Sequence, residues 1–263
     1  MTCEPENSRA RQAARLILPK EHGSWSLALE PLALGLLAAP STAGGWLTVA
    51  ALAGFFLRRP FKLAWGRKPD PRRRLAFECA AGLVTLAFAG LSLAAMSGGV
   101  AQLWPLIPAA LAGLAFVWFD LRNEAREGAG ELAGAIAFGI LPAAFGSVAG
   151  WNAVQSVALA AVMLARAVPT VLFVRTYLRF HKGRAATAMP ALIAAGAGLF
   201  LTAWLVLSRV APWPAALFAL AMTARTIWLL GWRPRLAAKA LGIAEATFGA
   251  AMVLALALTW KIF

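Results

Sequence analysis

The sequence predicts an all-α protein, a polytopic bundle of about nine transmembrane helices with a cytoplasmic N-terminus and an outside C-terminus. Three observations support this fold class. The 263 residues are 61% hydrophobic and 14% charged, with a mean hydropathy of +0.71, which is too apolar for one water-soluble core. Apolar stretches of about 20 residues, long enough to cross a membrane, recur along the chain. The basic residues gather in alternate loops.

The apolar stretches define the expected helices in order. A basic tail, residues 1–23, precedes the first of them, and Glu30 together with eight later spans favours an uncleaved anchor over a signal peptide. The rest of the chain, 24–263, is expected to form one transmembrane helical domain. The expected spans are 24–40, 43–57, 75–96, 103–119, 132–150, 155–174, 188–207, 214–230 and 240–260.

The orientation follows from lysine and arginine, which concentrate in short cytoplasmic loops. With the N-terminus inside, 21 of the 25 basic residues lie in inside segments, and the outside segments hold only Arg209 and Lys261. The remaining two, Arg166 and Arg225, fall within spans. The net charge of +14 is therefore first a topology signal. We expect membrane lipids as partners and no nucleic acid, because the basic residues are divided among loops that face an anionic lipid surface.

Several charged residues are expected inside the spans, all in the cytoplasmic half. A helix rises about 1.5 Å per residue, which puts Glu30, Arg225 and Glu245 about 8 to 9 Å inside their cytoplasmic helix ends, with Arg166 deeper. Because an uncompensated charge in lipid is costly, these groups should face one another or water. We therefore expect a polar cavity that opens only to the cytoplasm. Structural ion pairs that fix helix packing are the alternative for these four residues.

Arginines in two inside loops are candidate contacts for an anionic head group. Arg58 and Arg59 are expected to end the second helix against a proline and to point into the cavity mouth. Arg175 and Arg179 are four apart and share a helical face, with Arg166 expected on roughly the same side, about 13 Å deeper. A ladder of arginines suits an anionic head group. Anchoring to acidic lipids is the alternative for the loop residues.

Other polar residues are weaker candidates. The loop DLRNEAREGAGELAG spaces four carboxylates so that a helix would align them, although its glycines disfavour a continuous helix. No metal and no cofactor are expected, since an internally paired turn is the favoured interpretation and a divalent-ion site the weak alternative. His22 is a candidate ligand contact, although a capping role is more usual at a helix entrance. The weak metal candidates are Asp120, Glu124, Glu127 and Glu131.

Four stretches resemble the YwiC-like family of bacterial membrane proteins. They are PKEHGSW (Pro19 to Trp25), the proline of LEP (Pro31), FFLRRPFKLAW, and RAVPTVLFVRTYLRFHKGR. The resemblance extends over essentially the whole chain. It implies a multi-pass protein of the bacterial cytoplasmic membrane, and it implies location more than function.

A looser resemblance is to UbiA-type prenyltransferases, which also have nine helices, an inside N-terminus and a cavity at the cytoplasmic face. The stretch GAIAFGILPAAFG (Gly134 to Gly146) is similar to a Gly, Pro and Gly pattern of these enzymes. Their chemistry needs aspartate-rich loops that hold Mg²⁺ against a diphosphate. Here the first of those loops has only Asp70 and the second has no acid. Direct binding of an isoprenoid or lipid phosphate by arginine is expected instead.

The sequence leaves three functions open. In the first, the cavity binds an anionic amphiphile of the inner leaflet, with or without modifying it. Arg225 is among the contacts, and Glu30 and Glu245 are candidate acid/base groups. In the second, the protein is a small secondary transporter, against which the uncharged outer halves of the spans argue. In the third, it is a structural partner subunit.

Overall fold

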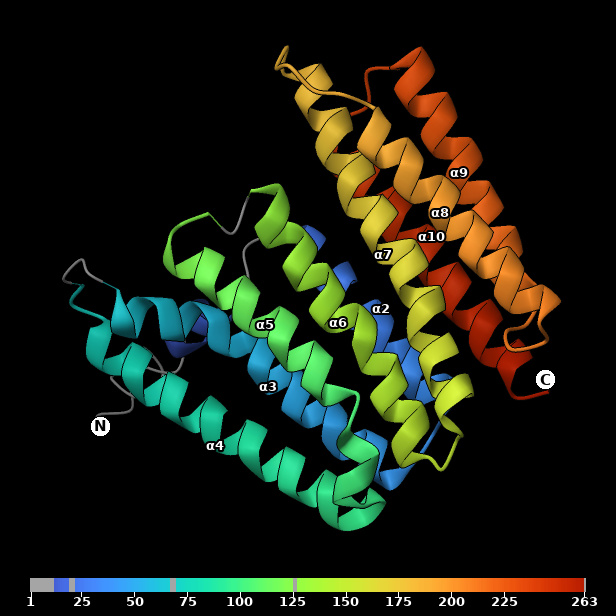
Figure 1. Cartoon of the computed structure of the whole chain (residues 1–263). Helices are drawn as coiled ribbons and strands as arrows, with labels where there is room; N and C mark the ends of the chain where they lie inside the picture. The colour runs from blue at the N-terminus through green and yellow to red at the C-terminus, as the bar shows by residue number, and fades with distance from the viewer. Residues whose placement is uncertain (1–11, 19–21, 67–69, 125–126, 263) are drawn as a thin grey trace, which may run out of the picture.

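The computed structural model describes residues 12–18, 22–66, 70–124 and 127–262, with the side chains of 22–24 excepted. Within these ranges the chain is helical, without a strand, and a short helical stretch at 12–17 precedes the long helices. The all-α prediction is confirmed. The elements are α2 His22–Ala38, α3 Thr42–Trp65, α4 Arg73–Gly98, the 3₁₀ helix η1 Val100–Leu103, α5 Leu106–Leu121, α6 Gly128–Val148, α7 Ala153–His181, α8 Met189–Leu207, α9 Pro214–Trp232 and α10 Ala238–Trp260 (Figure 1).

The helices α2 to α10 correspond to the nine predicted spans, but they differ in length and apolarity. Six are long and apolar enough to cross a membrane: α4, α6, α7, α8, α9 and α10. The apolar segments of α2 and α5, Trp25–Ala38 and Leu106–Leu121, are shorter. The chain is therefore a polytopic helical membrane protein, as predicted, whereas its inside N-terminus stays a prediction.

Two helices continue into segments that we expected to be loops. α3 runs through Pro60 to Trp65, so the expectation that Arg58 and Arg59 end this helix is wrong. A proline removes one backbone donor and crowds the preceding turn, but neighbouring helices make this tolerable in membrane proteins, and Pro60 is fully buried. α7 likewise extends to His181 and includes the predicted loop residue Arg175.

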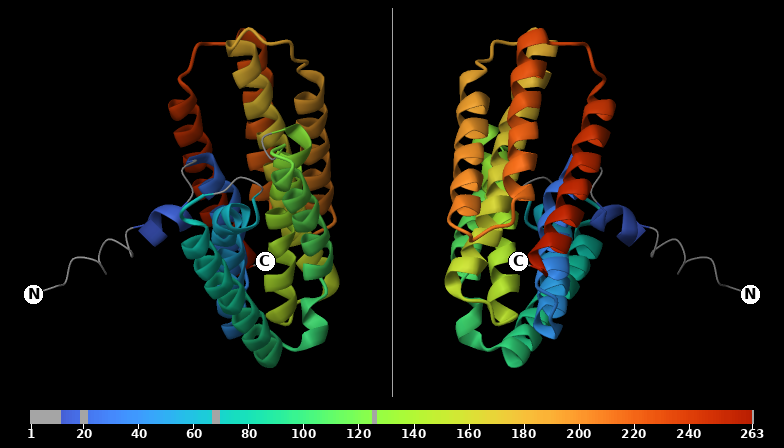
Figure 2. Two further views of the ribbon diagram at one scale, coloured as in Figure 1. Left: turned by 90° about the vertical axis from the view of Figure 1, so that its left-hand side faces the viewer. Right: turned by 90° about the vertical axis from the view of Figure 1, so that its right-hand side faces the viewer.

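The helices α2 and α6 connect two groups of helices. On one side α3 packs along α4, and α5 packs on α6. On the other side α7, α8, α9 and α10 form the second group, in which α7 contacts α6 and α10 contacts α2 (Figure 1). At one end of the molecule, the ends of α8, α9 and α10 extend beyond the α3–α4 hairpin (Figure 2). A side chain on α2 can therefore meet residues of the C-terminal group.

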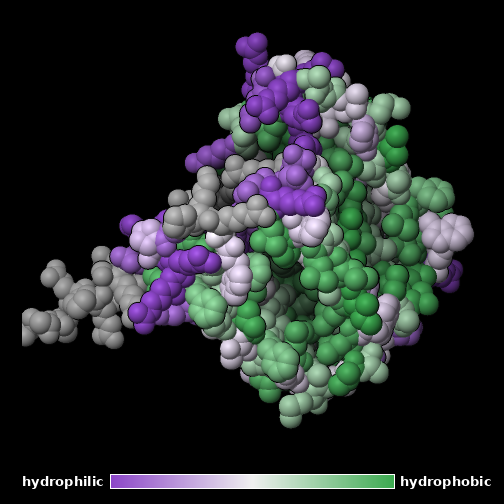
Figure 3. All heavy atoms as spheres, turned by 60° about the vertical axis from the view of Figure 1, so that its left-hand side comes forward, coloured by the Kyte–Doolittle hydropathy of each residue, from purple (hydrophilic) through white to green (hydrophobic). Residues whose placement is uncertain are grey.

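The surface carries the signature of lipid contact. Hydrophobic side chains cover most of the face in Figure 3, and hydrophilic side chains gather toward one end. Large apolar side chains are exposed on several helices, for example Phe88 on α4, Leu111 on α5 and Phe200 on α8. Exposed apolar surface on this scale is unfavourable in water. The outer surface of the bundle therefore agrees with the membrane location that the sequence predicts.

Candidate functional site

Four charged side chains from four helices meet inside the bundle. They are Glu30 of α2, Arg166 of α7, Arg225 of α9 and Glu245 of α10, and we call them the charged quartet. Acids and bases alternate along it, so its formal charge is zero. The prediction that these residues face one another is confirmed. Their roles as ligand contacts or acid/base groups stay predictions.

Arg166 is the centre of the quartet and is almost fully hydrogen-bonded. Its Nε and Nη2 donate to the two carboxylate oxygens of Glu30 at 2.8 and 3.0 Å, which is the side-on bidentate geometry. Nη2 also donates to the backbone oxygen of Glu245 at 2.8 Å, and Nη1 reaches Thr170 Oγ1 at 3.4 Å. Ser26 donates to Glu30 as well. Arg166 therefore ties α2, α7 and α10 together.

The other half of the quartet is incompletely bonded. Arg225 Nη1 donates to Glu245 Oε1, and the Arg225 guanidinium lies over the Phe173 ring at 4.4 Å from its centroid. Arg225 Nε and Nη2 are buried and have no hydrogen-bond acceptor among the described residues, and Glu245 Oε2 has no donor there. Arg166 Nη1 lies 3.8 Å from that oxygen. The unpaired edge of Arg225 consists of Nε and Nη2. The corresponding atoms of Arg166 bind the Glu30 carboxylate.

A glycine allows α10 to approach the quartet. A Cβ atom added to Gly249 would collide with the Glu30 carboxylate and with Arg166 Nη2. Any larger residue at this position would push α10 away from α2 and α7. Gly249 is therefore required for the geometry of the ion pairs, and it stands four residues, about one helical turn, after Glu245.

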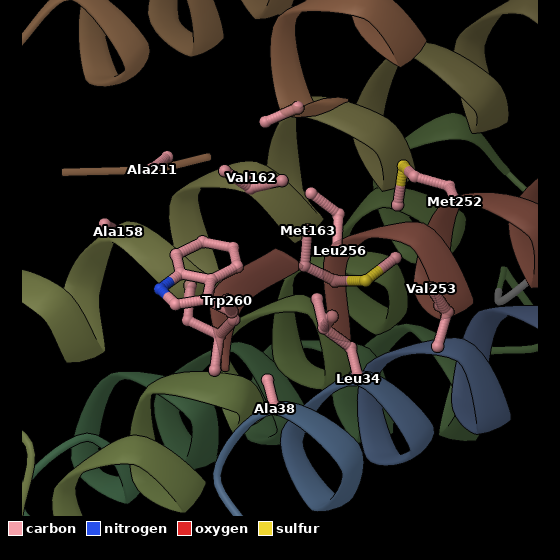
Figure 4. Packing of buried hydrophobic residues seen from close by; sticks show 12 residues of the cluster. Leu34, Ala38, Ala158, Val162, Met163, Ala211, Met252, Val253, Leu256 and Trp260 are labelled. Carbon is pink, nitrogen blue, oxygen red and sulfur yellow. The ribbon is translucent and has the colours of Figure 1, made fainter. Parts of the chain in front are cut away.

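An apolar core closes the quartet on one side. Leu34 of α2, Met163 of α7 and Leu256 of α10 pack together with neighbouring buried residues (Figure 4). Leu34 follows Glu30 on α2, and Leu256 follows Glu245 on α10, whereas Met163 precedes Arg166 on α7, which runs in the opposite direction. All three therefore lie on the same side of the quartet, the side that the predicted topology assigns to the outer half of the membrane.

Beside the quartet, where we expected a polar cavity open to the cytoplasm, the described residues form a small hollow. The hollow between α2 and α7 at Ser26, Glu30, Arg166 and Thr170 has a volume of about 10 Å³. That volume holds roughly one water molecule, whereas small-molecule sites measure about 300–1,000 Å³. The dense ion pairing and the close approach at Gly249 fill the space that we expected to be open.

Arg58 and Arg59 make contacts that the sequence did not suggest. Arg58 Nε and Nη2 donate to the buried carboxylate of Asp120 at 3.3 and 3.2 Å, and Lys62 Nζ joins them at 3.1 Å. We call Asp120, Arg58 and Lys62 the Asp120 triad, which connects α3 with α5. Arg59 Nη1 donates to the backbone oxygens of Arg15 and Leu18 and so holds the segment 12–18 on α3.

The expected ladder of arginines along α7 is wrong. Arg166 and Arg175 are nine residues apart, and at about 100° per residue they lie on opposite sides of the helix. Arg166 accordingly pairs with Glu30 in the quartet, whereas Arg175 Nη1 pairs with Glu131 Oε2 of α6 at 3.1 Å. Arg179 is exposed, and no ion pair of its side chain occurs within the described ranges. Arg166 and Arg175 therefore join α7 to different helices, and the three arginines do not form one binding face.

The weak metal candidates do not come together. α5 ends at Leu121 and α6 begins at Gly128, and Asn123 between them has the left-handed φ of 63°, so no continuous helix aligns the four carboxylates. Asp120 and Glu131 have separate basic partners. No group of three or more metal-binding side chains occurs in the described part of the chain.

Two further candidates complete the set. His22 begins α2, but its side chain lies outside the described residues. Asp70 accepts hydrogen bonds from Arg72 Nε and Nη2 at 3.1 and 3.0 Å, and these bonds lower the pKa of Asp70. The single acid of this loop is therefore already paired with an arginine.

Sequence reasoning missed several residues around the quartet. Ser26 precedes Glu30 by four residues, Thr170 follows Arg166 by four, and Phe173 follows Arg166 by seven. Such spacings put the missed residues on the same helical faces as the charges. Helical periodicity around each intramembrane charge would have identified them.

Comparison with known proteins gives a partial match to one family model and no function. Residues 18–145, just under half of the chain, match the family model described as YwiC-like protein. The match includes Glu30 and three of the four stretches quoted for the resemblance, and it ends before Arg166. No curated protein and no solved structure matches the chain. The looser resemblance to UbiA-type prenyltransferases is not confirmed.

Proposed function

We propose that this chain, a YwiC-like multi-pass membrane protein by its residues 18–145, binds the phosphate head group of an anionic lipid or isoprenoid at the charged quartet. The head group would enter from the cytoplasmic side of the bacterial cytoplasmic membrane. Arg225 is the primary contact in this proposal. Four of the other arginines predicted from sequence have protein partners: Arg58, Arg59, Arg166 and Arg175. Arg179 is exposed, and in this proposal it contacts the head group as the lipid approaches.

The unpaired edge of Arg225 is the observation that supports this proposal. Its Nε and Nη2 are buried without a hydrogen-bond acceptor among the described residues, and buried donors without partners are costly and rare in proteins. A phosphate presents two oxygens at the spacing that this edge binds. The Phe173 ring lies 4.4 Å from the Arg225 guanidinium, and this cation–π contact supplies no hydrogen-bond acceptor to that edge.

Binding requires a local rearrangement, because the hollow between α2 and α7 is small. The Arg225–Glu245 pair is the part of the quartet that can open, since Arg166 and Glu30 are held by several additional bonds. Glu245, whose Oε2 has no donor among the described residues, is also the better candidate for an acid/base role, because both oxygens of Glu30 are bonded.

The transporter alternative has less support. Transport needs a path through both membrane halves, and the apolar core of Leu34, Met163 and Leu256 lies across the route beyond the quartet. Binding from one side needs no such path. We therefore place the transporter second.

Native mass spectrometry of the purified protein tests the proposal. An anionic lipid or isoprenoid phosphate should remain bound to the unmodified protein in the presence of EDTA, and an Arg225→Gln variant should lose most of it. Arg209→Gln is the matched control, because it removes an exposed arginine between α8 and α9. Equal retention of the same molecule by all three proteins would contradict the proposal.

A further inference from the structure

A second feature of the molecule lies away from the quartet, where α3 ends and α4 begins. An open groove there has a volume of about 540 Å³ and is lined by Ala64, Trp65, Arg73, Arg74, Phe77 and Glu78. This volume lies within the range of about 300–1,000 Å³ of small-molecule sites. The groove shares no residue with the quartet or with the Asp120 triad.

Two guanidinium groups border the groove. Arg73 Nε donates to the backbone oxygen of Ala64 at 2.8 Å, which fixes this side chain across the helix ends. Within the described residues its Nη atoms make no hydrogen bond, so they can bind another group. Arg74 lies 3.4 Å from Glu78, but its side chain is 93% exposed, and ion pairs at such exposure are weak. The groove thus offers two arginines against one carboxylate.

Aromatic rings form the apolar part of the groove. Trp65 stacks on Phe61 with centroids 4.7 Å apart, and the Phe77 ring lies 5.4 Å from Trp65. Trp65 and Phe77 are both about half exposed. Aromatic side chains of this kind are enriched where a membrane meets water, because their rings contact lipid while polar neighbours reach the head groups.

We infer that this groove binds the head group of one anionic phospholipid, with its phosphate on Arg73 and Arg74 and its glycerol and upper acyl carbons against Trp65 and Phe77. A soluble anion would use the arginines but leave the exposed rings without a partner. A zwitterionic phospholipid would cover the rings but bring no net charge to the two arginines. The predicted topology puts this groove at the cytoplasmic interface, where anionic lipids carry the surface charge.

Fluorescence quenching by brominated lipids tests the site. The full-length protein is reconstituted in phosphatidylcholine vesicles with a minor fraction of brominated phosphatidylglycerol or, separately, brominated phosphatidylcholine. The difference in quenching between the unmodified protein and Trp65→Phe isolates Trp65. We expect Trp65 to prefer phosphatidylglycerol, and each arginine to contribute about fivefold to that preference, because a basic residue near an anionic surface is worth roughly 1 kcal/mol.

The double variant Arg73→Gln/Arg74→Gln should abolish the preference. Lys182→Gln/Arg184→Gln is the matched control, since it removes the same charge from a different loop, and it should leave the preference unchanged. Arg74→Gln alone should reduce it and keeps the test valid if loss of Arg73 loosens the α3–α4 contact. Equal quenching by both lipids, or a preference that survives in the double variant, would overturn the inference. Arg225→Gln should leave the preference intact, so failure here is distinguishable from failure of the proposed function.

Discussion

The Asp120 triad and the charged quartet use the same ion pairs in different surroundings. The acids are similarly buried, with 8% of the side chain exposed for both Asp120 and Glu245. The bases differ, because Arg58 and Lys62 are 32% and 40% exposed whereas Arg166 is 3% exposed. Water can therefore stabilise the charges of the triad if a partner is removed. Water does not stabilise the buried Arg166 in the same way, so each charge of the quartet depends on the other charges.

The two regions also differ in how completely their hydrogen bonds are formed. The single carboxylate of Asp120 accepts bonds on both oxygens from two bases. In the quartet the charges balance, yet Arg225 keeps two buried donors without an acceptor in the described structure. A fully bonded group of charges is explained by helix packing alone. An unpaired buried donor requires a further explanation, and for this reason we assign ligand binding to the quartet.

The topology gives the largest expected effect, because labelling is present or absent. In a background without Cys3 and Cys79, single cysteines at Gly98, Asn152 and Pro212 should react with a membrane-impermeant reagent added outside. Cysteines at Gly66, Gly128 and Gly183 should not, because the basic residues of their segments predict a cytoplasmic location. Outside labelling at any of the latter three would contradict the topology that places the Asp120 triad and the charged quartet in the cytoplasmic half of the membrane.

Loss of Arg166 should give the largest fall in stability. Arg166→Gln leaves the carboxylates of Glu30 and Glu245 buried without their shared partner, and breaking a buried pair in this way costs about 3–5 kcal/mol. Denaturation of the purified protein in detergent measures the loss. Adding Glu30→Gln should restore part of it, because the carboxylate that lost its basic partner is then neutral, whereas Glu245 still pairs with Arg225. Strictly additive losses would show that Glu30 and Arg166 act independently.

The close approach of α10 gives the next effect. Gly249→Ala places a methyl group against the Glu30 carboxylate and Arg166, and overpacking of this kind costs roughly 1–3 kcal/mol. Gly242→Ala is the matched control on the same helix, since nothing lies within 4 Å of the added Cβ atom. Equal stability of the two variants by thermal denaturation would contradict the described packing around the quartet.

The Asp120 triad should give the smallest effect. Asp120→Asn leaves Arg58 and Lys62 partly exposed, and Arg58 keeps its position over the Phe116 ring. The expected loss is at most about 1 kcal/mol, the range of partly solvated ion pairs. Chemical denaturation measures it beside Arg166→Gln. A loss of stability as large as that of Arg166→Gln would contradict the proposed difference in solvation between the triad and the quartet.

The sequence predicted the helices and the quartet because both depend on local or one-dimensional rules. Apolar length defined the nine helices, and the cost of charge in lipid implied that Glu30, Arg166, Arg225 and Glu245 face one another or water. The partners of Asp120 and Arg175 could not be predicted, because they depend on which helices are neighbours. Pro60 misled the prediction of α3, since tertiary packing tolerates a proline that an isolated helix would not.

The small size of the hollow between α2 and α7 also could not be predicted from the sequence. Charges in the cytoplasmic half fit equally well around a water-filled space or against one another. The choice depends on how closely the helices approach, and here Gly249 allows direct contact between α10 and the Glu30–Arg166 pair. Only the three-dimensional arrangement distinguishes a polar cavity from a set of ion pairs.

Binding of an isoprenoid monophosphate to Arg225 variants tests the central claim most directly. Affinity is measured for the purified protein with geranylgeranyl monophosphate, in EDTA and at two salt concentrations. Arg225→Lys keeps the charge but loses the planar edge, so affinity should fall, and it should fall further with Arg225→Gln. EDTA should have no effect, and salt only a modest one, because buried charges are screened less than exposed ones. Unchanged affinity in Arg225→Gln, or binding that disappears with EDTA and returns with Mg²⁺, would contradict the account.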